Sequence, residues 1–104
     1  MINAQVKGAR GETEVVNILK AHEFVAKRNG CFAKDDVTCF YAGPDLEPAI
    51  IEVKRKNIGS AKVYEELKGR DEVWHRANGQ DWMVTLLAKD YLALRLLAKG
   101  TGGV

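Results

Sequence analysis

A carboxylate and an amine stand two residues apart at Glu52 and Lys54, in a segment (49–54) whose β-branched and apolar residues predict a strand. Side chains alternate across a strand, so both groups project from one face, while Ile51 and Val53 project from the other and can enter a core. The carboxylate can help hold a divalent cation, and the lysine can orient water and stabilise developing charge. The pair suits phosphodiester hydrolysis, although an exposed ion pair of this kind is common and contributes only about 0–1 kcal/mol.

A second carboxylate is predicted to lie opposite Glu52. Residues 37–41 are β-branched and aromatic and predict a strand, and residues 43–48 have turn composition, so the two strands should form an antiparallel hairpin. A turn centred on Pro44 aligns Asp36 with Glu52. Two facing carboxylates repel each other unless a cation lies between them, so this alignment predicts a magnesium site.

Two other aspartates compete for that position. Asp35 takes it if the register slips by one residue. Asp45 ranks third, because facing Glu52 would force the β-branched run into the bend, whereas its own surroundings have turn composition. The same alignment places Val37 opposite Ile51.

A third carboxylate stands on an apolar helix face. Residues 9–21 predict a helix whose apolar stripe comprises Val15, Val16 and Leu19. At 100° per residue Glu12 falls in the middle of that stripe, and Glu14 points away from it. A carboxylate on a core-facing stripe is costly unless a partner compensates it, so Glu12 needs an explanation.

The remaining elements complete an α/β fold with the order α-β-β-β-α-β-β-α around a mixed sheet. Residues 24–28 predict a strand and 60–67 a helix, and Asn78-Gly79 predicts a hairpin between 71–76 and 81–86. Residues 89–99 predict a closing helix. This helix and the Trp74/Trp82 hairpin are candidates for an interface or for the core, and the core is favoured. We expect one domain over 1–99 and a flexible tail over 100–104.

Composition bounds the class of protein. The 104 residues are 46% hydrophobic and 29% charged, which indicates a globular domain rather than a disordered one. No apolar run approaches a membrane span, and two cysteines make no disulfide framework. From residues 1–5 we expect no signal peptide. A soluble intracellular domain is expected. The net charge is +2, and ten of the sixteen basic residues precede residue 63. If three carboxylates of that stretch hold a metal, the remainder has a net charge of about +5, a modest footprint for nucleic acid.

These residues together resemble a known family. Glu12, Asp36 and Glu52-Val53-Lys54 are similar to the signature of the PD-(D/E)XK nucleases. More narrowly, residues 7–12 and 50–56 resemble the archaeal-type Holliday junction resolvases, including phage-encoded forms. The sequence departs from the family pattern at Asp35-Asp36, where Pro-Asp is usual, and has no glutamine in 60–67. The resemblance implies a restriction-endonuclease-like mixed β-sheet flanked by helices.

The resemblance also implies an activity. It predicts a homodimeric, Mg²⁺-dependent endonuclease, with Mn²⁺ as a substitute, that nicks two strands of a four-way DNA junction symmetrically. Asp36 and Glu52 would be metal ligands, Glu12 would complete the acidic cluster, and Lys54 would position water. Contacts to the DNA backbone would come from basic residues, which makes binding weaken with salt. Those residues are Lys7, Arg10, Lys27, Arg28, Lys34, Arg55 and Lys56.

Two other functions remain open from the sequence. One is a nuclease of the same fold that cuts flaps, nicks or duplex in repair or restriction. The other is a DNA-binding module without catalysis, against which the complete set of Glu12, Asp36, Glu52 and Lys54 argues. In each case we expect the cytoplasm of a prokaryotic or phage-infected cell.

Overall fold

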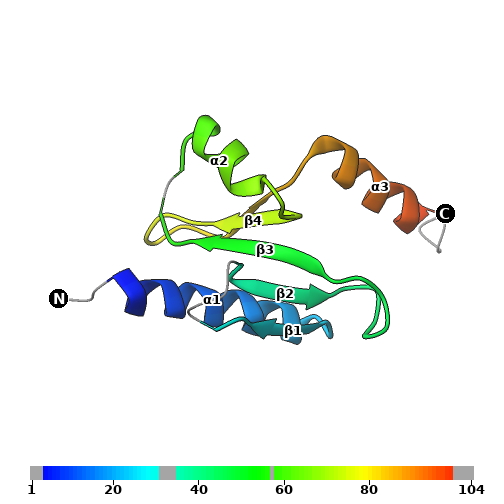
Figure 1. Ribbon diagram of the computed structural model, residues 1–104, viewed down its shortest axis with the longest axis horizontal. Coiled ribbons are helices and arrows are strands. Elements are labelled where there is room, and N and C mark those ends of the chain that lie inside the picture. The colour runs from blue at the N-terminus through cyan, green and yellow to red at the C-terminus, as the bar shows by residue number, and fades with distance from the viewer. Residues whose placement is uncertain (1–3, 31–34, 57, 100–104) are drawn as a thin grey trace.

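The computed structural model of the protein describes residues 4–30, 35–56 and 58–99, with side chains from residue 9 onward (Figure 1). Eight elements follow in the predicted order. They are α1 (Ala4–Ala21), β1 (Val25–Arg28), β2 (Val37–Phe40), β3 (Ala49–Lys54), α2 (Ser60–Leu67), β4 (Glu72–His75), β5 (Met83–Thr85) and α3 (Ala88–Ala98). Most ends agree with the prediction to within two residues. The exception is the start of α1, which lies at Ala4 rather than Ala9.

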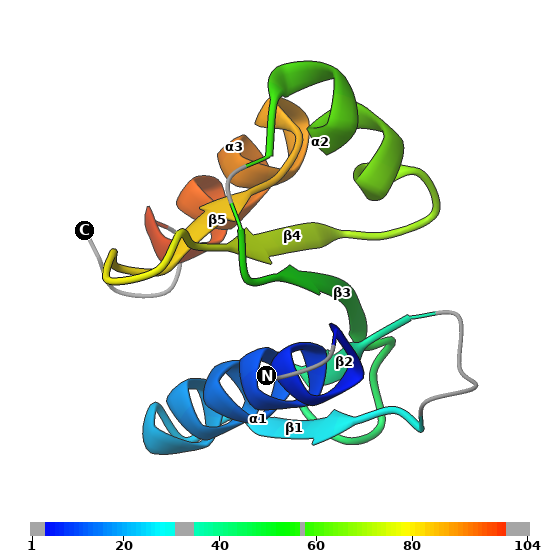
Figure 2. The same cartoon turned by 90° about the vertical axis from the view of Figure 1, so that its left-hand side faces the viewer.

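The five strands form one mixed sheet in the order β1-β2-β3-β4-β5. All neighbours are antiparallel except β3 and β4, which are parallel and are connected through α2. Parallel neighbours need such a crossover connection, and the helix in it lies against the sheet. Figure 2 shows α1 beside β1 and β2 at one end of the sheet and α2 beside β4 toward the other. The predicted α/β fold with a mixed sheet is confirmed.

The core lies between α1 and the face of the sheet that Ile51 and Val53 occupy. Both side chains are buried, as the alternation along β3 predicted. The apolar stripe of α1 packs against these two side chains, because packing removes the apolar surface of both from water. The buried cluster consists of Val15, Val16, Leu19, Ala26, Val37, Cys39, Ile51, Val53 and Trp74.

The opposite face of the sheet carries Glu52 and Lys54. Their partners on the parallel neighbour β4 are Val73 and His75. Helix α2 lies on this side, since Glu66 of α2 is within 3.7 Å of the Lys54 ammonium. The two faces therefore differ in chemistry: one is an apolar core under α1, and the other holds ionisable groups under α2.

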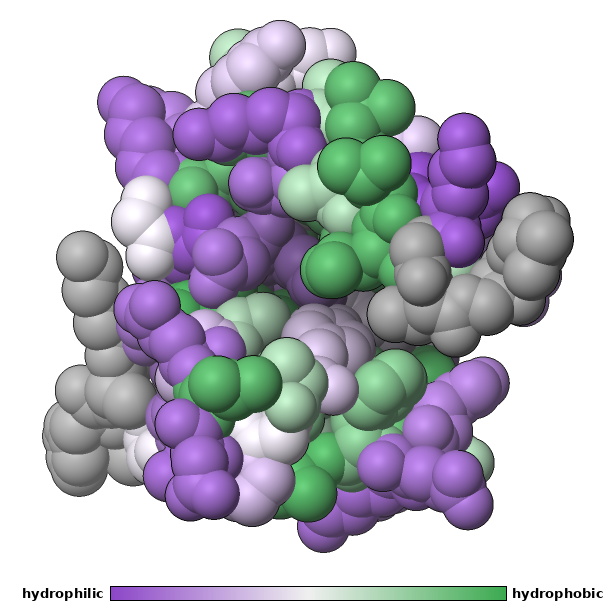
Figure 3. Space-filling view, turned by 90° about the vertical axis from the view of Figure 1, so that its right-hand side faces the viewer, coloured by the Kyte–Doolittle hydropathy of each residue, from purple (hydrophilic) through white to green (hydrophobic). Residues whose placement is uncertain are grey.

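The prediction that α3 packs into the core is wrong. The structure describes all of this helix and buries none of its residues, and Tyr91, Leu92, Leu94 and Leu96 are each about half exposed or more. Hydrophobic residues gather on the face of the molecule seen from the α3 end (Figure 3). Apolar residues occur all round this helix, so its sequence shows only that it favours burial and not which surface covers it.

The Trp74/Trp82 hairpin does belong to the core. Trp74 is 9% exposed, and its ring centroid lies 6.4 Å from that of Trp82, which packs against the cluster. The two tryptophans are diagonal rather than directly opposite, because Trp74 pairs with Val84. Cys39 is buried as a small apolar residue, as expected, and Cys31 lies outside the described residues. Among the described helices none is long and apolar enough to cross a membrane.

Candidate active site

The β2–β3 register places Asp36 beside β3. Val37 pairs with Ile51, as predicted, so the next position along the hairpin brings Asp36 level with Glu52. The Val53 backbone N–H donates to Asp36 Oδ2 at 2.9 Å. This bond holds the carboxylate where the β2 ladder ends. Asp45, the third-ranked alternative, lies exposed in the turn between β2 and β3.

Glu52 is a buried carboxylate held between two cations. Its side chain is 8% exposed, Lys54 Nζ lies 3.1 Å from Oε2, and Arg70 Nε lies 3.2 Å from Oε1. Oε1 is nevertheless buried without a hydrogen-bond partner among the described residues. Burial, together with the nearby charge of Asp36, raises the pKa of Glu52 to about 7, against the opposing effect of the two cations.

Lys54 is the amine of the site. Burial alone would lower its pKa, but the hydrogen bond and charge of Glu52, aided by Glu66, raise the pKa above its ordinary value. The amine is therefore protonated at neutral pH. It can donate hydrogen bonds and stabilise negative charge, but it has no lone pair with which to accept a proton.

Glu12 approaches from the α1 side. Its side chain is 17% exposed, and Arg28 Nε lies 3.3 Å from Oε1, which supplies the partner that a carboxylate on the apolar stripe requires. Burial and the charge of Asp36 raise the pKa of Glu12, while Arg28 opposes that rise. The charge of Asp36 acts on both Glu12 and Glu52. Asp36 is thus near enough to influence both Glu12 and Glu52, but the three carboxylates, all of them among the described residues, do not form one group arranged to hold a metal.

Two further residues of the site, Arg70 and Glu66, were missed by reasoning from sequence. Arg70, in the loop between α2 and β4, lies 3.0 Å from Asp35 Oδ1 through Nε and donates from Nη1 to the Glu66 carbonyl at 2.9 Å. Asp35 is thus an ion-pair partner of Arg70. The four-residue spacing of Glu66 and Arg70 is a usable signal, because residues at that spacing in and beyond a helix lie close together. Nothing in the sequence places this pair beside Glu52.

The predicted DNA-binding residues occupy several environments. Arg10, Lys27 and Lys56 are exposed, and Arg28 is half exposed while paired with Glu12. Lys34 and the side chain of Lys7 lie outside the described residues.

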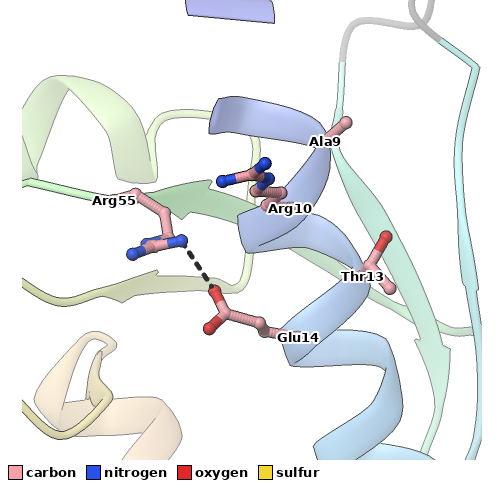
Figure 4. A pocket seen from close by; sticks show the side chains of 5 residues that line it. All are labelled: Ala9, Arg10, Thr13, Glu14 and Arg55. Atoms are coloured by element: carbon pink, nitrogen blue, oxygen red, sulfur yellow. Dashed lines mark ion pairs between the residues drawn. The ribbon is translucent and has the colours of Figure 1, made fainter. Parts of the chain in front are cut away.

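Arg55 is held back from solvent at the edge of α1. Its Nη1 lies 3.2 Å from Glu14 Oε2, and its side chain is 17% exposed. Arg55 and Glu14, with Arg10, Ala9 and Thr13, line a hollow of about 510 Å³, and Figure 4 shows Glu14 pointing toward Arg55. The guanidinium of Arg10 is therefore more accessible to a DNA phosphate than that of Arg55.

The donor set of the site suits a hard divalent cation in part. Asp36 and Glu52 supply carboxylate oxygens, which are the ligands that Mg²⁺ prefers, and Glu52 Oε1 is a buried acceptor to which no described group donates. No group of three Asp, Glu, His or Cys side chains is arranged to hold a metal within residues 4–30, 35–56 and 58–99. Mg²⁺ commonly keeps several waters and takes only one or two protein carboxylates, so Asp36 and Glu52 alone would be enough to hold it.

The fold has a solved counterpart. The Holliday junction resolvase Hjc of Archaeoglobus fulgidus, an archaeal hyperthermophile, superposes with a TM-score of 0.55. The likeness covers 77% of this chain and 72% of Hjc, at 22% sequence identity. This chain has the Hjc fold. The predicted restriction-endonuclease-like mixed sheet is thereby confirmed, with helices on both of its faces. Neither a protein-family model nor a curated protein matches the sequence.

Proposed function

We propose that this protein is a structure-selective, metal-dependent endodeoxyribonuclease that resolves four-way DNA junctions by paired symmetric nicks. The observation that carries the proposal is the convergence of Asp36, Glu52 and Lys54 at the β2–β3 hairpin. The fold it shares with a protein that is itself a Holliday junction resolvase supports the choice of substrate.

Asp36 and Glu52 would hold Mg²⁺ or Mn²⁺. An ion held there would polarise the phosphate and lower the pKa of a water. Lys54, protonated and 3.1 Å from Glu52, would orient the attacking water or stabilise charge on the phosphate oxygens. Glu12, held by Arg28, adds negative potential beside Asp36 and strengthens the attraction for the cation.

Backbone contacts to DNA would come from exposed cations around the acidic site. Arg10, Lys27 and Lys56 are exposed to solvent, and Arg28 is half exposed although it pairs with Glu12. Phosphate contacts give affinity without reading sequence, so the protein should select DNA by shape and lose affinity steeply as salt rises.

Two copies of the chain would act together, and α3 would join them. A partner surface would bury the exposed leucines of α3. The charges of the helix are self-complementary, because Asp90 lies in its first turn and Arg95 in its last. In an antiparallel pair of α3 helices about a two-fold axis, Asp90 of each copy faces Arg95 of the other, and Tyr91 faces Leu94. An isologous contact of this kind repeats each ion pair twice and closes the assembly as a dimer.

The test is cleavage of a labelled four-way junction beside flap, nicked and linear duplexes of matched sequence, with MgCl₂ or with EDTA. Glu52→Gln and Asp36→Asn remove the two ligands, and Asp45→Asn removes an exposed turn carboxylate as the matched control. Paired nicks on the junction that need Mg²⁺, are lost in the first two variants and persist in the control support the proposal.

Other outcomes decide against parts of it. Equal cleavage of flaps or duplex would retain the nuclease and discard junction selectivity. Binding of DNA without hydrolysis in Mg²⁺ or Mn²⁺ would leave a DNA-binding module.

A further inference from the structure

A guanidinium lies against the carboxylates of the candidate site. Arg70 Nε is 3.0 Å from Asp35 Oδ1 and 3.2 Å from Glu52 Oε1, and Nη1 is 3.7 Å from Glu66 Oε2. The side chain of Arg70 is 14% exposed, so it is screened little by solvent. One cation thereby joins the loop before β2, strand β3 and helix α2.

The position of Arg70 relative to Glu52 is unlike that of an ordinary structural ion pair. Its Nε–H is donated to Asp35, and Glu52 Oε1, although only 3.2 Å away, accepts no hydrogen bond from the described part of the chain. Arg70 therefore compensates the charge of Glu52 but does not saturate that oxygen. An oxygen that is buried, charge-compensated and still able to accept a ligand is suited to exchanging one cation for another.

The charges of the cluster favour such an exchange. Among the described residues, the centre of the cluster holds four carboxylates, Asp35, Asp36, Glu52 and Glu66, and two cations, Lys54 and Arg70. Lys62, at the margin, pairs with both Glu65 and Glu66. A divalent ion at Asp36 and Glu52 would face the positive charge of Arg70 at short range in a partly buried site, where like charges repel strongly. Arg70 and a metal ion thus compete for the same negative potential.

We propose that Arg70 sets the metal affinity of the site: it neutralises Glu52 and Asp35 in the metal-free protein and opposes the binding of a divalent cation. Arg70 is a positioning residue, because it acts through Glu52 and through the loop that carries Asp36. The inference rests on the proposed metal site at Asp36 and Glu52.

The experiment measures Mn²⁺ binding to the full chain by the loss of the free-ion electron paramagnetic resonance signal, with Mg²⁺ as competitor and no DNA present. Arg70→Gln should lower the melting temperature of the metal-free protein and yet tighten Mn²⁺ binding about tenfold or more, because one repelling charge is gone. Arg70→Lys keeps the charge and should bind Mn²⁺ as the wild type does.

Arg76→Gln is the matched control. Arg76 is as buried as Arg70, at 16% exposed, and its Nη2 lies 2.7 Å from Glu14, on the other side of the sheet from Glu52. This variant should lose stability with unchanged Mn²⁺ affinity. Unchanged or weaker binding in Arg70→Gln, or the same tightening in Arg76→Gln, would overturn the inference.

A measurement on the wild type covers the case in which Arg70→Gln does not fold. The Nε–H signal of Arg70, identified by its loss in Arg70→Lys, should shift as Mg²⁺ saturates the site, while that of Arg76 stays in place. A signal that does not respond to saturating Mg²⁺ contradicts the inference. Two results would contradict the proposed metal site itself: no Mn²⁺ binding by wild type, or equal Mn²⁺ binding after Glu52→Gln. The other contrary outcomes contradict only the inference about Arg70.

Discussion

At the scale of single residues, the chemistry of the site depends on the burial of Glu52. Its pKa of about 7 lies above the value of 4.5 that it has in the unfolded chain. The folded state therefore holds a proton that the unfolded state has released between these values. In that window stability falls as pH rises, and above pH 7 the destabilisation is complete.

The first prediction concerns this pH dependence in metal-free protein. From pH 5 to pH 8, wild type should lose up to about 3 kcal/mol of unfolding free energy relative to Glu52→Gln, which carries no titrating group at this position. Urea unfolding in EDTA at the two pH values measures the difference. Glu65→Gln removes an exposed carboxylate of α2, and the difference between its unfolding free energies at the two pH values should equal that of wild type. If Glu52→Gln also shows the wild-type difference, the raised pKa of Glu52 is contradicted.

A second prediction uses the metal itself as a ligand. Mg²⁺ that binds only the folded protein stabilises it, by about 2.7 kcal/mol at a concentration one hundred times Kd. At pH 8 the melting temperature of wild type should therefore rise with MgCl₂, while that of Asp36→Asn should not. Replacing MgCl₂ with NaCl at equal ionic strength controls for screening, and an equal rise in both salts would exclude a specific site.

The residues of the site were predictable to different extents. Asp36 and Glu52 follow from hairpin register, because alternation and turn composition are local properties. Glu12 follows from a helical angle. Arg70 could not be predicted, since its place beside Glu52 depends on how α2 and its following turn fold back over β3, and Gly69 makes that turn with φ 73°.

At the scale of elements, the approach of α1 to β3 depends on a small residue. A Cβ added at Gly11 would lie 2.6 Å from Arg55 Cγ and 3.3 Å from Val53 Cγ1. Glu14 holds the Arg55 guanidinium, so that side chain cannot simply swing away. Gly11 thus lets the helix that carries Glu12 come down onto the strand that carries Glu52.

The third prediction follows from this contact. Gly11→Ala gains about 1 kcal/mol of helix propensity but overpacks the interface, which typically costs about 1–3 kcal/mol, so it should destabilise the protein by up to about 2 kcal/mol. Gly30→Ala is the control, because no described atom lies within 4 Å of its added Cβ and its φ lies outside the left-handed region. Urea unfolding measures both. A Gly11→Ala variant as stable as wild type would show that α1 and Arg55 adjust freely.

The strands and helices themselves were largely predictable, and the surroundings of α3 were not. Strand β3 and helix α2 have the predicted ends, because β-branched runs and turn residues bound them locally. For α3, the apolar residues favour burial, but the structure, which describes the whole helix, buries none of them, and burial against another chain has the same sequence pattern as burial in the core.

At the scale of the whole molecule, the exposed α3 yields the fourth prediction. Wild type should be a dimer by sedimentation equilibrium, and Asp90→Arg or Arg95→Asp alone should weaken dimerisation, since each places like charges opposite each other twice in a two-fold pair. The double variant exchanges the two charges and should restore the dimer.

The double variant also excludes simple loss of folding. Lys89→Asp changes charge in the same first turn without entering the proposed ion pair, and it should leave the dimer intact. A monomeric wild type would remove α3 as the interface. Two single variants as dimeric as wild type would show that Asp90 and Arg95 do not meet.

The hydrogen bond from the Val53 amide to Asp36 has a consequence for how the protein comes into being. A carboxylate that is held by the backbone of the neighbouring strand reaches its place only when β2 and β3 have paired. In a chain still emerging from synthesis, or partly unfolded, Asp36 has no fixed place beside Glu52. For the nuclease proposed above, the metal site would therefore form only with the pairing of β2 and β3, together with the packing of the elements that carry Glu12 and Arg70.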